Sequence, residues 1–173
     1  MIILKHIDID LDAYSIMLAY HEINLFREKI APAMLKLIEW LAENGVEIAK
    51  AELMAFDPPA YYSGELHDSI QYHLDEGDGI TYSSYATVTA GEGLYDGEGE
   101  KSYAIYVEEG TGIYGKDIHG HGVEGWWYFN VNDGHWHWTN GMRPRPFMYN
   151  TFRILEDKAQ TEGGYVLAEY LAE

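Results

Sequence analysis

The chain has 173 residues, of which 47% are hydrophobic and 14% aromatic, with 29 acidic side chains against 11 basic ones and no cysteine. A chain of this length buries roughly two-thirds of its unfolded surface, which predicts a single domain, 1–173, with a hydrophobic core and not a disordered chain. The lack of cysteine excludes disulfides, thiolate metal sites and cysteine catalysis.

The formal net charge of −18 limits the partners that the chain can bind. Residues 51–100 contain eleven acidic side chains and no lysine or arginine. Because a nucleic-acid-binding protein neutralises phosphates with basic side chains, we expect no specific DNA or RNA binding. We expect no membrane association either, since the short apolar runs fit neither a signal peptide nor a membrane span. The product should stay in the cytoplasm where it is made.

The amino-terminal third is predicted to be an arm followed by a long helix. Residues 1–22 are expected to form an arm or an edge strand, because Met1–Leu11 alternates loosely between apolar and polar residues. Apolar residues then recur at three- and four-residue steps, which predicts one amphipathic helix over 24–55. Asn24 is its expected N-cap, and Pro32 is expected in or near its first turn.

Trp40 is the one large aromatic residue on the polar side of this predicted helix. At 100° per residue it projects between Lys36 and Glu47. We expect it to contact another element or another subunit. The alternative is that the carboxy-terminal part of the same chain covers it.

Residues 80–142 are predicted to form antiparallel strands and loops. A short capped helix or turn at Ser63–Ile70 precedes them. Ile80–Ala90 is rich in Thr, Tyr and Val and predicts a strand, and Gly91–Lys101 predicts an exposed loop between paired strands. Tyr103–Glu108 fits a strand and a helix equally well, so both alternatives stay open. Gly110–Gly125 contains six glycines and predicts a long loop.

The last third is predicted to contain a hairpin and a helix. Trp126–Val131 and His135–Thr139 flank Asn132-Asp133-Gly134, and Asp-Gly between such runs is a strong hairpin signal. A carboxy-terminal helix is predicted over 147–171, bent or interrupted at Gly163-Gly164. The expected fold is therefore α+β, with a long amino-terminal helix and a carboxy-terminal helix packed on a small antiparallel sheet with long Gly-rich loops.

Two histidines on the predicted hairpin are candidate metal ligands. His135 and His137 are two residues apart in a strand and share a face, which would turn Trp136 and Trp138 toward the core. A catalytic zinc takes three protein ligands, and only Asp133 or a histidine of the Gly-rich loop (His119 or His121) could complete the set. A metal-dependent hydrolase is therefore one alternative function. The other interpretation is a half-exposed amphipathic face without a metal.

No nucleophile motif, phosphate loop or dinucleotide fingerprint accompanies these residues. We therefore expect no catalytic residue, no metal and no cofactor, and the chain is not predicted to be an enzyme. We expect Glu108 to satisfy backbone donors or an arginine and not to catalyse a reaction. Gly64, Gly110 and Gly112 are expected to permit turns.

Four segments in a fixed order resemble a known family. They read P-A-Y-Y-S-G-E-L-H-D-S-I (Pro59–Ile70), Y-A-I-Y-V-E-E-G-T-G (Tyr103–Gly112), G-W-W-Y (Gly125–Tyr128) and T-N-G-M-R-P-R-P-F (Thr139–Phe147). This arrangement is similar to the tail-component family of long-tailed bacteriophages that is named after the tenth gene product of a lambdoid phage. The resemblance covers roughly residues 24–155. Ser63 stands where the family has Thr, and Glu109 replaces its usual aromatic residue.

The resemblance implies a structural protein of the virion neck, the head–tail connector. Such proteins act in tail completion or head–tail joining, also in prophages, and assemble in the host cytoplasm. The implied partners are copies of the chain itself, in a ring of six around the DNA channel, and the adjoining head-completion or connector and tail-terminator or tail-tube proteins. The motif positions with an implied structural role are Gly64, Leu66, Ser69, Ile70, Tyr103, Glu108, Gly110, Thr111, Gly141, Pro146 and Phe147.

A ring needs head-to-tail contacts between two different patches of each subunit. The acidic stretch 51–100, with Glu98 and Glu100, and the basic residues Arg143, Arg145 and Arg153 are suitable opposite patches. We expect these residues and Trp40 to lie at interfaces. A further alternative function is an acidic inhibitor that mimics DNA, since the charge is suited to that role too.

Overall fold

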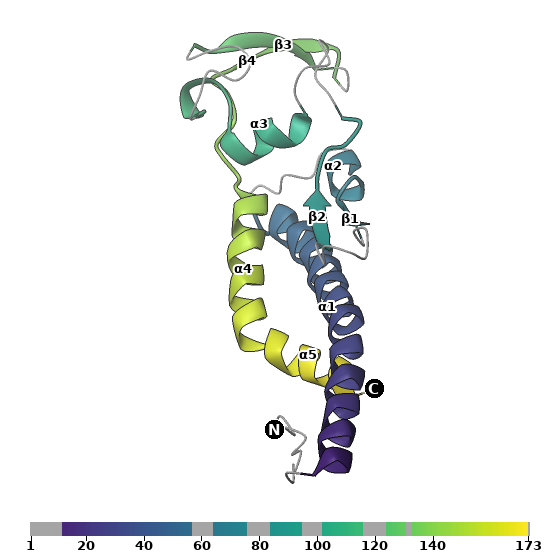
Figure 1. The fold of residues 1–173 in the computed structure, drawn as a ribbon. Helices are drawn as coiled ribbons and strands as arrows, with labels where there is room; N and C mark the ends of the chain where they lie inside the picture. Colours follow the sequence, from purple (N-terminus) through teal and green to yellow (C-terminus); the bar gives the residue numbers. More distant parts are fainter. Residues whose placement is uncertain are drawn as a thin grey trace. The chain divides into compact units, whose positions relative to one another are not determined.

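The computed structural model describes residues 12–56, 64–75, 84–94, 102–115, 124–130 and 133–172. It confirms a mixed α+β fold with a long amino-terminal helix, carboxy-terminal helices and two small antiparallel sheets (Figure 1). In chain order the elements are α1 (Ala13–Ala55), α2 (Glu65–Asp68), β1 (Gln71–Asp75), β2 (Tyr85–Thr89), α3 (Tyr103–Glu109), a 3-10 turn η1 (Gly112–Tyr114), β3 (Trp126–Asn130), β4 (His135–Thr139), α4 (Phe147–Thr161) and α5 (Gly163–Ala172).

The contacts divide the chain into two compact units. One comprises Met1–Glu43, Leu74–Thr87 and Glu156–Glu173, and the other comprises Asn44–His73 and Val88–Leu155. Helices α1 and α4 and the β1–β2 pair contribute residues to both units. This division therefore does not decide whether the chain is a single domain, which stays a prediction.

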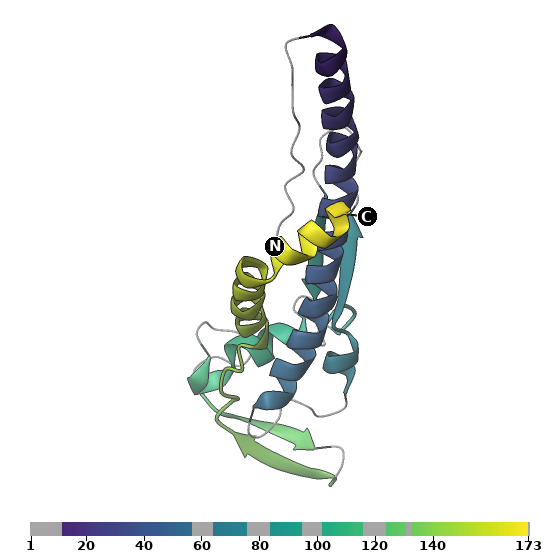
Figure 2. The same ribbon diagram turned by 90° about the horizontal axis from the view of Figure 1, so that it is seen from below.

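Helix α1 starts earlier than the sequence predicted and runs without interruption for 43 residues (Figure 2). Asp12 is its N-cap: the Asp12 Oδ1 atom accepts hydrogen bonds from the backbone N–H groups of Tyr14 (2.9 Å) and Ser15 (3.0 Å). The expected arm or strand over 1–22 is therefore wrong from residue 13 onward, and residues 1–11 lie outside the described residues.

Asn24 and Pro32 are consequently interior residues of α1 and not its N-cap and first turn. The misplacement has a physical cause. The first turns of α1 carry apolar side chains on more than one side, so no single amphipathic stripe marks where the helix begins. Helix α1 ends at Ala55, where the predicted helix ends.

The strands form two separate sheets where one was expected. In the first, β1 pairs with β2. The predicted strand over 80–90 is confirmed for Tyr85–Thr89, whereas residues 80–83 lie outside the described residues. The expected pairing across the Gly91–Lys101 loop is wrong, because β2 pairs with the preceding strand β1, which the sequence analysis missed, and a helix follows the loop.

That helix, α3, resolves the ambiguity at Tyr103–Glu108. Its N-cap is Ser102, whose hydroxyl accepts a hydrogen bond from the backbone N–H of Ala104 (3.3 Å). This N-cap favours a helix, whereas the periodicity of six residues could not distinguish a helix from a strand. The short helix expected at Ser63–Ile70 is also confirmed as α2, although its N-cap is Gly64 and Ser63 lies outside the described residues.

The carboxy-terminal third follows the prediction closely. Strands β3 and β4 form the antiparallel hairpin, with Trp127 opposite Trp138 and Phe129 opposite Trp136. The predicted helix from Phe147 is present and is interrupted at Glu162, directly before the expected Gly163-Gly164, so that it forms α4 and α5.

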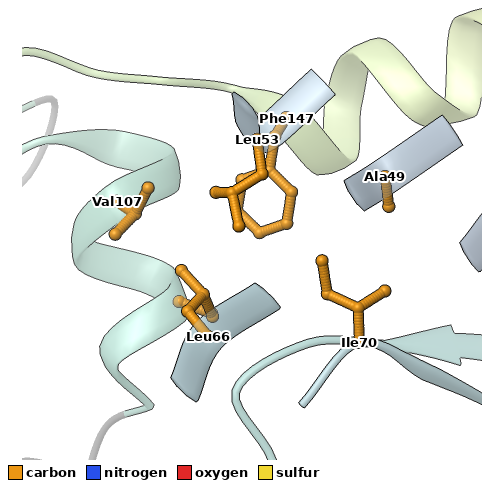
Figure 3. Packing of buried hydrophobic residues seen from close by; sticks show 7 residues of the cluster. Ala49, Leu53, Leu66, Ile70, Val107 and Phe147 are labelled. Atoms are coloured by element: carbon orange, nitrogen blue, oxygen red, sulfur yellow. The ribbon is translucent and has the colours of Figure 1, made fainter. Parts of the chain in front are cut away.

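One hydrophobic core lies wholly within the second unit. Its buried residues come from α1, α2, α3, the first turn of α4 and Ile70, which lies between α2 and β1 (Figure 3). Phe147, Leu53 and Val107 are its largest fully buried side chains. The buried members of this core are Ala49, Leu53, Leu66, Ile70, Ala104, Val107 and Phe147.

Two contacts of lysine side chains with aromatic rings join elements of the first unit. The Lys158 ammonium lies 5.1 Å from the centre of the Trp40 ring, and the Lys36 ammonium lies 5.0 Å from that of Tyr170. Both are cation–π contacts between α1 and the carboxy-terminal helices. Trp40 is half-buried, so the carboxy-terminal part of the chain does contact it, as the alternative held. Its role at an interface stays a prediction.

Replacing Phe147 with alanine should destabilise the fold strongly. The ring is fully buried, so its removal should lower the free energy of unfolding by about 3–5 kcal/mol. Phe152→Ala is the matched control, because Phe152 lies in the same helix with 61% of its side chain exposed. The control should cost less than about 1 kcal/mol. Urea unfolding followed by circular dichroism measures both, and equal losses would contradict the assigned core.

Candidate functional site

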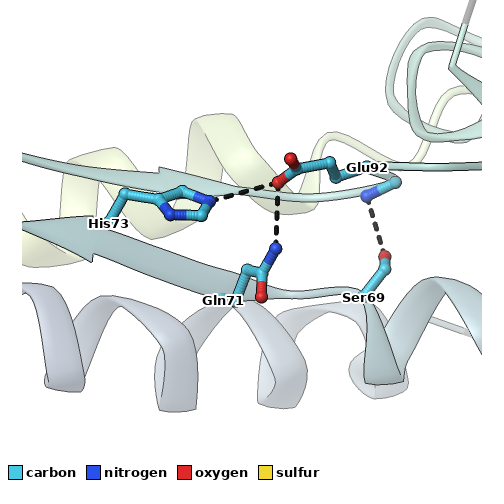
Figure 4. Close-up of polar contacts among 5 residues, drawn as sticks. Ser69, Gln71, His73 and Glu92 are labelled. Atoms are coloured by element: carbon cyan, nitrogen blue, oxygen red, sulfur yellow. Dashed lines mark hydrogen bonds and ion pairs between the residues drawn. The ribbon is translucent and has the colours of Figure 1, made fainter.

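The family-motif residues meet in the second unit and bind one another. Ser69, at the end of α2, shows the pattern. Its hydroxyl donates to the Leu66 carbonyl (2.7 Å). It also accepts from the backbone N–H of Gly91 (2.8 Å), as Figure 4 shows. The Ser69 side chain thus connects the end of α2 to the segment that follows β2. The neighbouring motif residues Leu66 and Ile70 are buried in the core.

Glu108 joins α3 to the first turn of α4. Its two carboxylate oxygens accept hydrogen bonds from the backbone N–H groups of Met148 (2.9 Å) and Tyr149 (3.0 Å). A carboxylate is favourable there because the first amides of a helix lack internal partners and the helix dipole is positive at that end. The expectation that Glu108 satisfies backbone donors is confirmed.

Thr111 and Gly141 bring two motifs into direct contact. The backbone N–H of Thr111 donates to the Met142 carbonyl (2.8 Å), and the backbone N–H of Met142 donates to the Thr111 hydroxyl (2.9 Å). Gly141 has φ 107° and passes so close to the Thr111 carbonyl that a side chain would collide with it. Gly110 has φ 79°, and a Cβ there would lie 2.7 Å from the Met142 carbonyl oxygen. Glycine is required at both positions.

The remaining motif residues complete this connection. Pro146 precedes α4, and Phe147, the last residue of the fourth segment, fills the core. The backbone N–H of Tyr103 donates to the Leu94 carbonyl (2.7 Å), while its side chain is 44% exposed. Gly64 and Gly112 also have positive φ, as expected. The motif residues therefore build a scaffold, and their polar groups are used within it.

The hairpin presents an exposed aromatic surface above this scaffold. On one face of β3–β4 lie the cross-strand pairs Trp127–Trp138 and Phe129–Trp136, each with ring centres 5.6 Å apart in an edge-on arrangement. All four rings are exposed, Trp136 by 64% and Trp127 by 61%. We call these four residues the aromatic face. The expectation that Trp136 and Trp138 face the core is wrong.

Sequence reasoning missed Trp127 and Phe129 as members of this surface. The sequence contains a signal for this surface, since each strand carries four aromatic or imidazole side chains in succession. Alternate positions of a strand share a face, so Trp127 and Phe129 lie on the face that carries Trp136 and Trp138. Exposed aromatic rings gathered in one patch mark a binding surface.

The histidines lie on the opposite face of the hairpin. His137 contacts the Asp133 carboxylate through Nε2 at 2.7 Å and stacks on Tyr128, while the backbone N–H of His135 donates to Asp133 Oδ1 (2.9 Å). Asp133 therefore fastens the turn. Within the described residues no cluster of three histidine or carboxylate side chains could hold a metal. His119 and His121, the proposed third ligands, lie outside those residues.

Two further polar pairs have pKa values that differ from those of free side chains. Hydrogen bonds from His73 (3.1 Å) and Gln71 (2.9 Å) to Glu92 lower the pKa of the Glu92 carboxyl (Figure 4). A hydrogen bond to Asp75 and the negative charge of Asp75 raise the pKa of the Tyr85 hydroxyl. All of these side chains lie along β1, β2 and the turn after β2.

The predicted interface cations occupy different environments. Arg143 is exposed and its guanidinium lies 5.4 Å from the centre of the Tyr114 ring. Arg145 is half-buried, and its backbone N–H donates to the Val107 carbonyl (2.8 Å). Arg153 is exposed on α4. Their acidic counterparts Glu98 and Glu100 lie outside the described residues, so the structure does not test the proposed opposition of the two patches.

Among the described residues, no helix is both long enough and apolar enough to cross a membrane. Comparisons of the chain with models of protein families, with curated proteins and with solved structures gave no match. The resemblance to the tail-component family therefore rests on the four motifs, and any function rests on the surfaces described above.

Removing the Glu108 carboxylate should destabilise the start of α4. Glu108→Ala leaves two backbone donors without their charged acceptor, which should cost about 1–2 kcal/mol of unfolding free energy. Glu108→Gln retains one acceptor oxygen and should cost less. Glu169→Ala, at an exposed position of α5, is the control. Urea denaturation checks the order of the variants, and a Glu108→Ala loss no larger than the control would contradict the capping role.

Acid should loosen the hairpin turn at a pH below the ordinary range of aspartate. The hydrogen bond from the His135 backbone N–H, followed by the one from His137, lowers the pKa of the Asp133 carboxyl in the folded chain. The stabilisation is therefore fully present above the unfolded pKa and is lost as the pH falls through the lower folded value. Near-UV circular dichroism of the hairpin tryptophans should follow this loss. Asp133→Asn should abolish that transition, and its persistence in the variant would rule Asp133 out as the cause.

Proposed function

We propose that the chain is a non-enzymatic structural protein of a bacteriophage head–tail connector. It acts in tail completion or head–tail joining, as a ring of copies around the DNA channel in the neck of the virion. The observation that carries the proposal is the exposed aromatic face of the hairpin, mounted on a scaffold that the family-motif residues build. A protein whose motif residues build a scaffold for an exposed aromatic surface is suited to assembly with other proteins.

The use of the motif residues supports this role. Backbone groups of the same unit hydrogen-bond to the side chains of Ser69, Glu108 and Thr111. A catalytic site holds polar groups ready for a substrate, whereas these groups are already engaged. The resemblance thus concerns residues that maintain a shape, which is what a structural component of a virion requires.

The aromatic face supports assembly for an energetic reason. Burying apolar surface contributes about 25 cal/mol per Å², and tryptophan and tyrosine are enriched where protein partners meet. A contact through Trp136 and Trp127 would remove large rings from water. Adjoining proteins of the neck, or another copy of the chain, are partners that would cover such a surface.

The charge of the chain also fits a channel component. With 29 acidic and 11 basic residues, the ring would repel the phosphates of passing DNA and would not retain them. Arg143 follows β4 of the hairpin in the chain. Its exposed guanidinium offers a basic contact for an acidic neighbour. Within the described residues, no contact favours the metal-dependent hydrolase or the DNA-mimicking inhibitor over this role.

Reversing the charge of Arg143 tests the proposal. Virions assembled with the Arg143→Glu chain should give separate heads and tails in electron micrographs, because a basic contact to an acidic neighbour becomes a repulsion. Arg143→Lys keeps the positive charge and should give joined particles. Circular dichroism of both variants establishes that they fold. Joined particles in normal yield from Arg143→Glu would count against the neck role of this residue.

A further inference from the structure

The first part of α1, from Ala13 to Met34, exposes apolar side chains around most of its circumference, and two groups of them lie on opposite sides. Three isoleucines at seven-residue intervals share one side and are called here the isoleucine face: Ile16, Ile23 and Ile30. The other side carries three residues called here the leucine face: Tyr14, Leu18 and Leu25. At 100° per residue, the centres of these faces lie roughly 160° apart around the helix.

Both faces are open to solvent. Ile23 is 52% exposed and Leu25 is 44% exposed, and the other four members are at least as open as Ile30, at 42%. A surface helix of a globular protein carries one apolar stripe, which its own core covers. A helix with two opposite apolar faces needs a neighbour on each side.

We propose that the isoleucine face of one copy packs against the leucine face of the next copy. The inference rests on the proposed assembly function and names the helix that joins the copies. Because the two faces differ, the contact is head-to-tail, and repetition of such a contact closes a ring when the rotation between copies allows it. Isoleucine at seven-residue spacing is also the arrangement by which parallel helices pack side by side.

One pair of charges beside the two faces is complementary. Arg27 borders the isoleucine face, Glu28 borders one flank of the leucine face and Lys29 the other, and all three side chains are exposed. When parallel copies meet through unlike faces, Arg27 of one helix lies beside Glu28 of the next, at nearly the same height along the axis. Complementary charges of this kind fix orientation and register.

The total charge of the segment favours association as well. Residues 12–34 hold three acidic side chains (Asp12, Glu22, Glu28) and two basic ones (Arg27, Lys29), which gives a formal charge of −1. The whole chain carries −18, so copies that approach elsewhere repel one another more strongly. Pairing of the isoleucine face with itself would leave Tyr14, Leu18 and Leu25 in water, which is why we favour contact between unlike faces.

Cysteine cross-linking tests this contact cleanly, because the chain has no cysteine of its own. Ile23→Cys and Leu25→Cys place one thiol on each face. After oxidation, each single variant should stay monomeric in a denaturing gel without reductant. An equal mixture of the two variants should give a covalent dimer, and the double variant should give a ladder of higher oligomers that reductant removes.

Matched substitutions in the double variant separate the contact from the fold. Ile16→Asp adds a charge to the isoleucine face and should abolish the ladder, whereas Asn24→Asp adds the same charge between the faces and should preserve it. Circular dichroism establishes that α1 is intact in both. Covalent dimers from Ile23→Cys alone would show that like faces pair, and monomer alone from folded double variant would show that another segment covers these faces. Either result overturns the proposal.

The outcome is also separable from that of the neck function. If the double cysteine variant gives the ladder and Arg143→Glu gives joined virions, the helix contact is supported and the neck role is contradicted. Separate heads and tails from Arg143→Glu without a ladder would keep the neck role and reject α1 as the joint between copies.

Discussion

The carboxylate of Glu108 is the contact on which the second unit depends. It accepts two backbone hydrogen bonds from the first turn of α4 and thereby sets where that helix starts relative to α3. Phe147, the first residue of α4, is in consequence held in the core beside Leu53 and Val107. The hairpin leads directly into α4 through residues 140–146. The contact of Glu108 therefore also fixes the end of the segment that follows the aromatic face.

Sequence patterns predicted the elements whose signals are local. The Asp-Gly turn identified the hairpin, and Gly163 marked the break between α4 and α5, because each depends on the conformational preference of one or two residues. The start of α1 was misplaced, since its N-cap Asp12 is followed by a helix with apolar residues on two sides. Strand β1 was missed although Gln71–Asp75 alternates polar and apolar residues, and in the structure this segment pairs with β2.

Surface properties were harder to predict than elements. Alternation placed His135 and His137 correctly on one face of the hairpin, but it could not tell which face the chain would cover. Trp136 and Trp138 were assigned to the core because they alternate with the two histidines, whereas the structure leaves them exposed. The motifs in turn located Ser69, Glu108 and Thr111, yet only the structure shows that their polar atoms bind backbone groups across long stretches of sequence.

The proline in the interior of α1 has a mechanical consequence. Pro32 has no amide hydrogen, so the carbonyl of Glu28, four residues before it, lacks its usual helical donor, and the pyrrolidine ring crowds that carbonyl. Helices bend most easily at such a point. Pro32 lies between the turns that carry the two apolar faces and those that contact the carboxy-terminal helices. Pro32 is therefore the position at which the amino-terminal turns of α1 bend most easily relative to the turns that contact the carboxy-terminal helices.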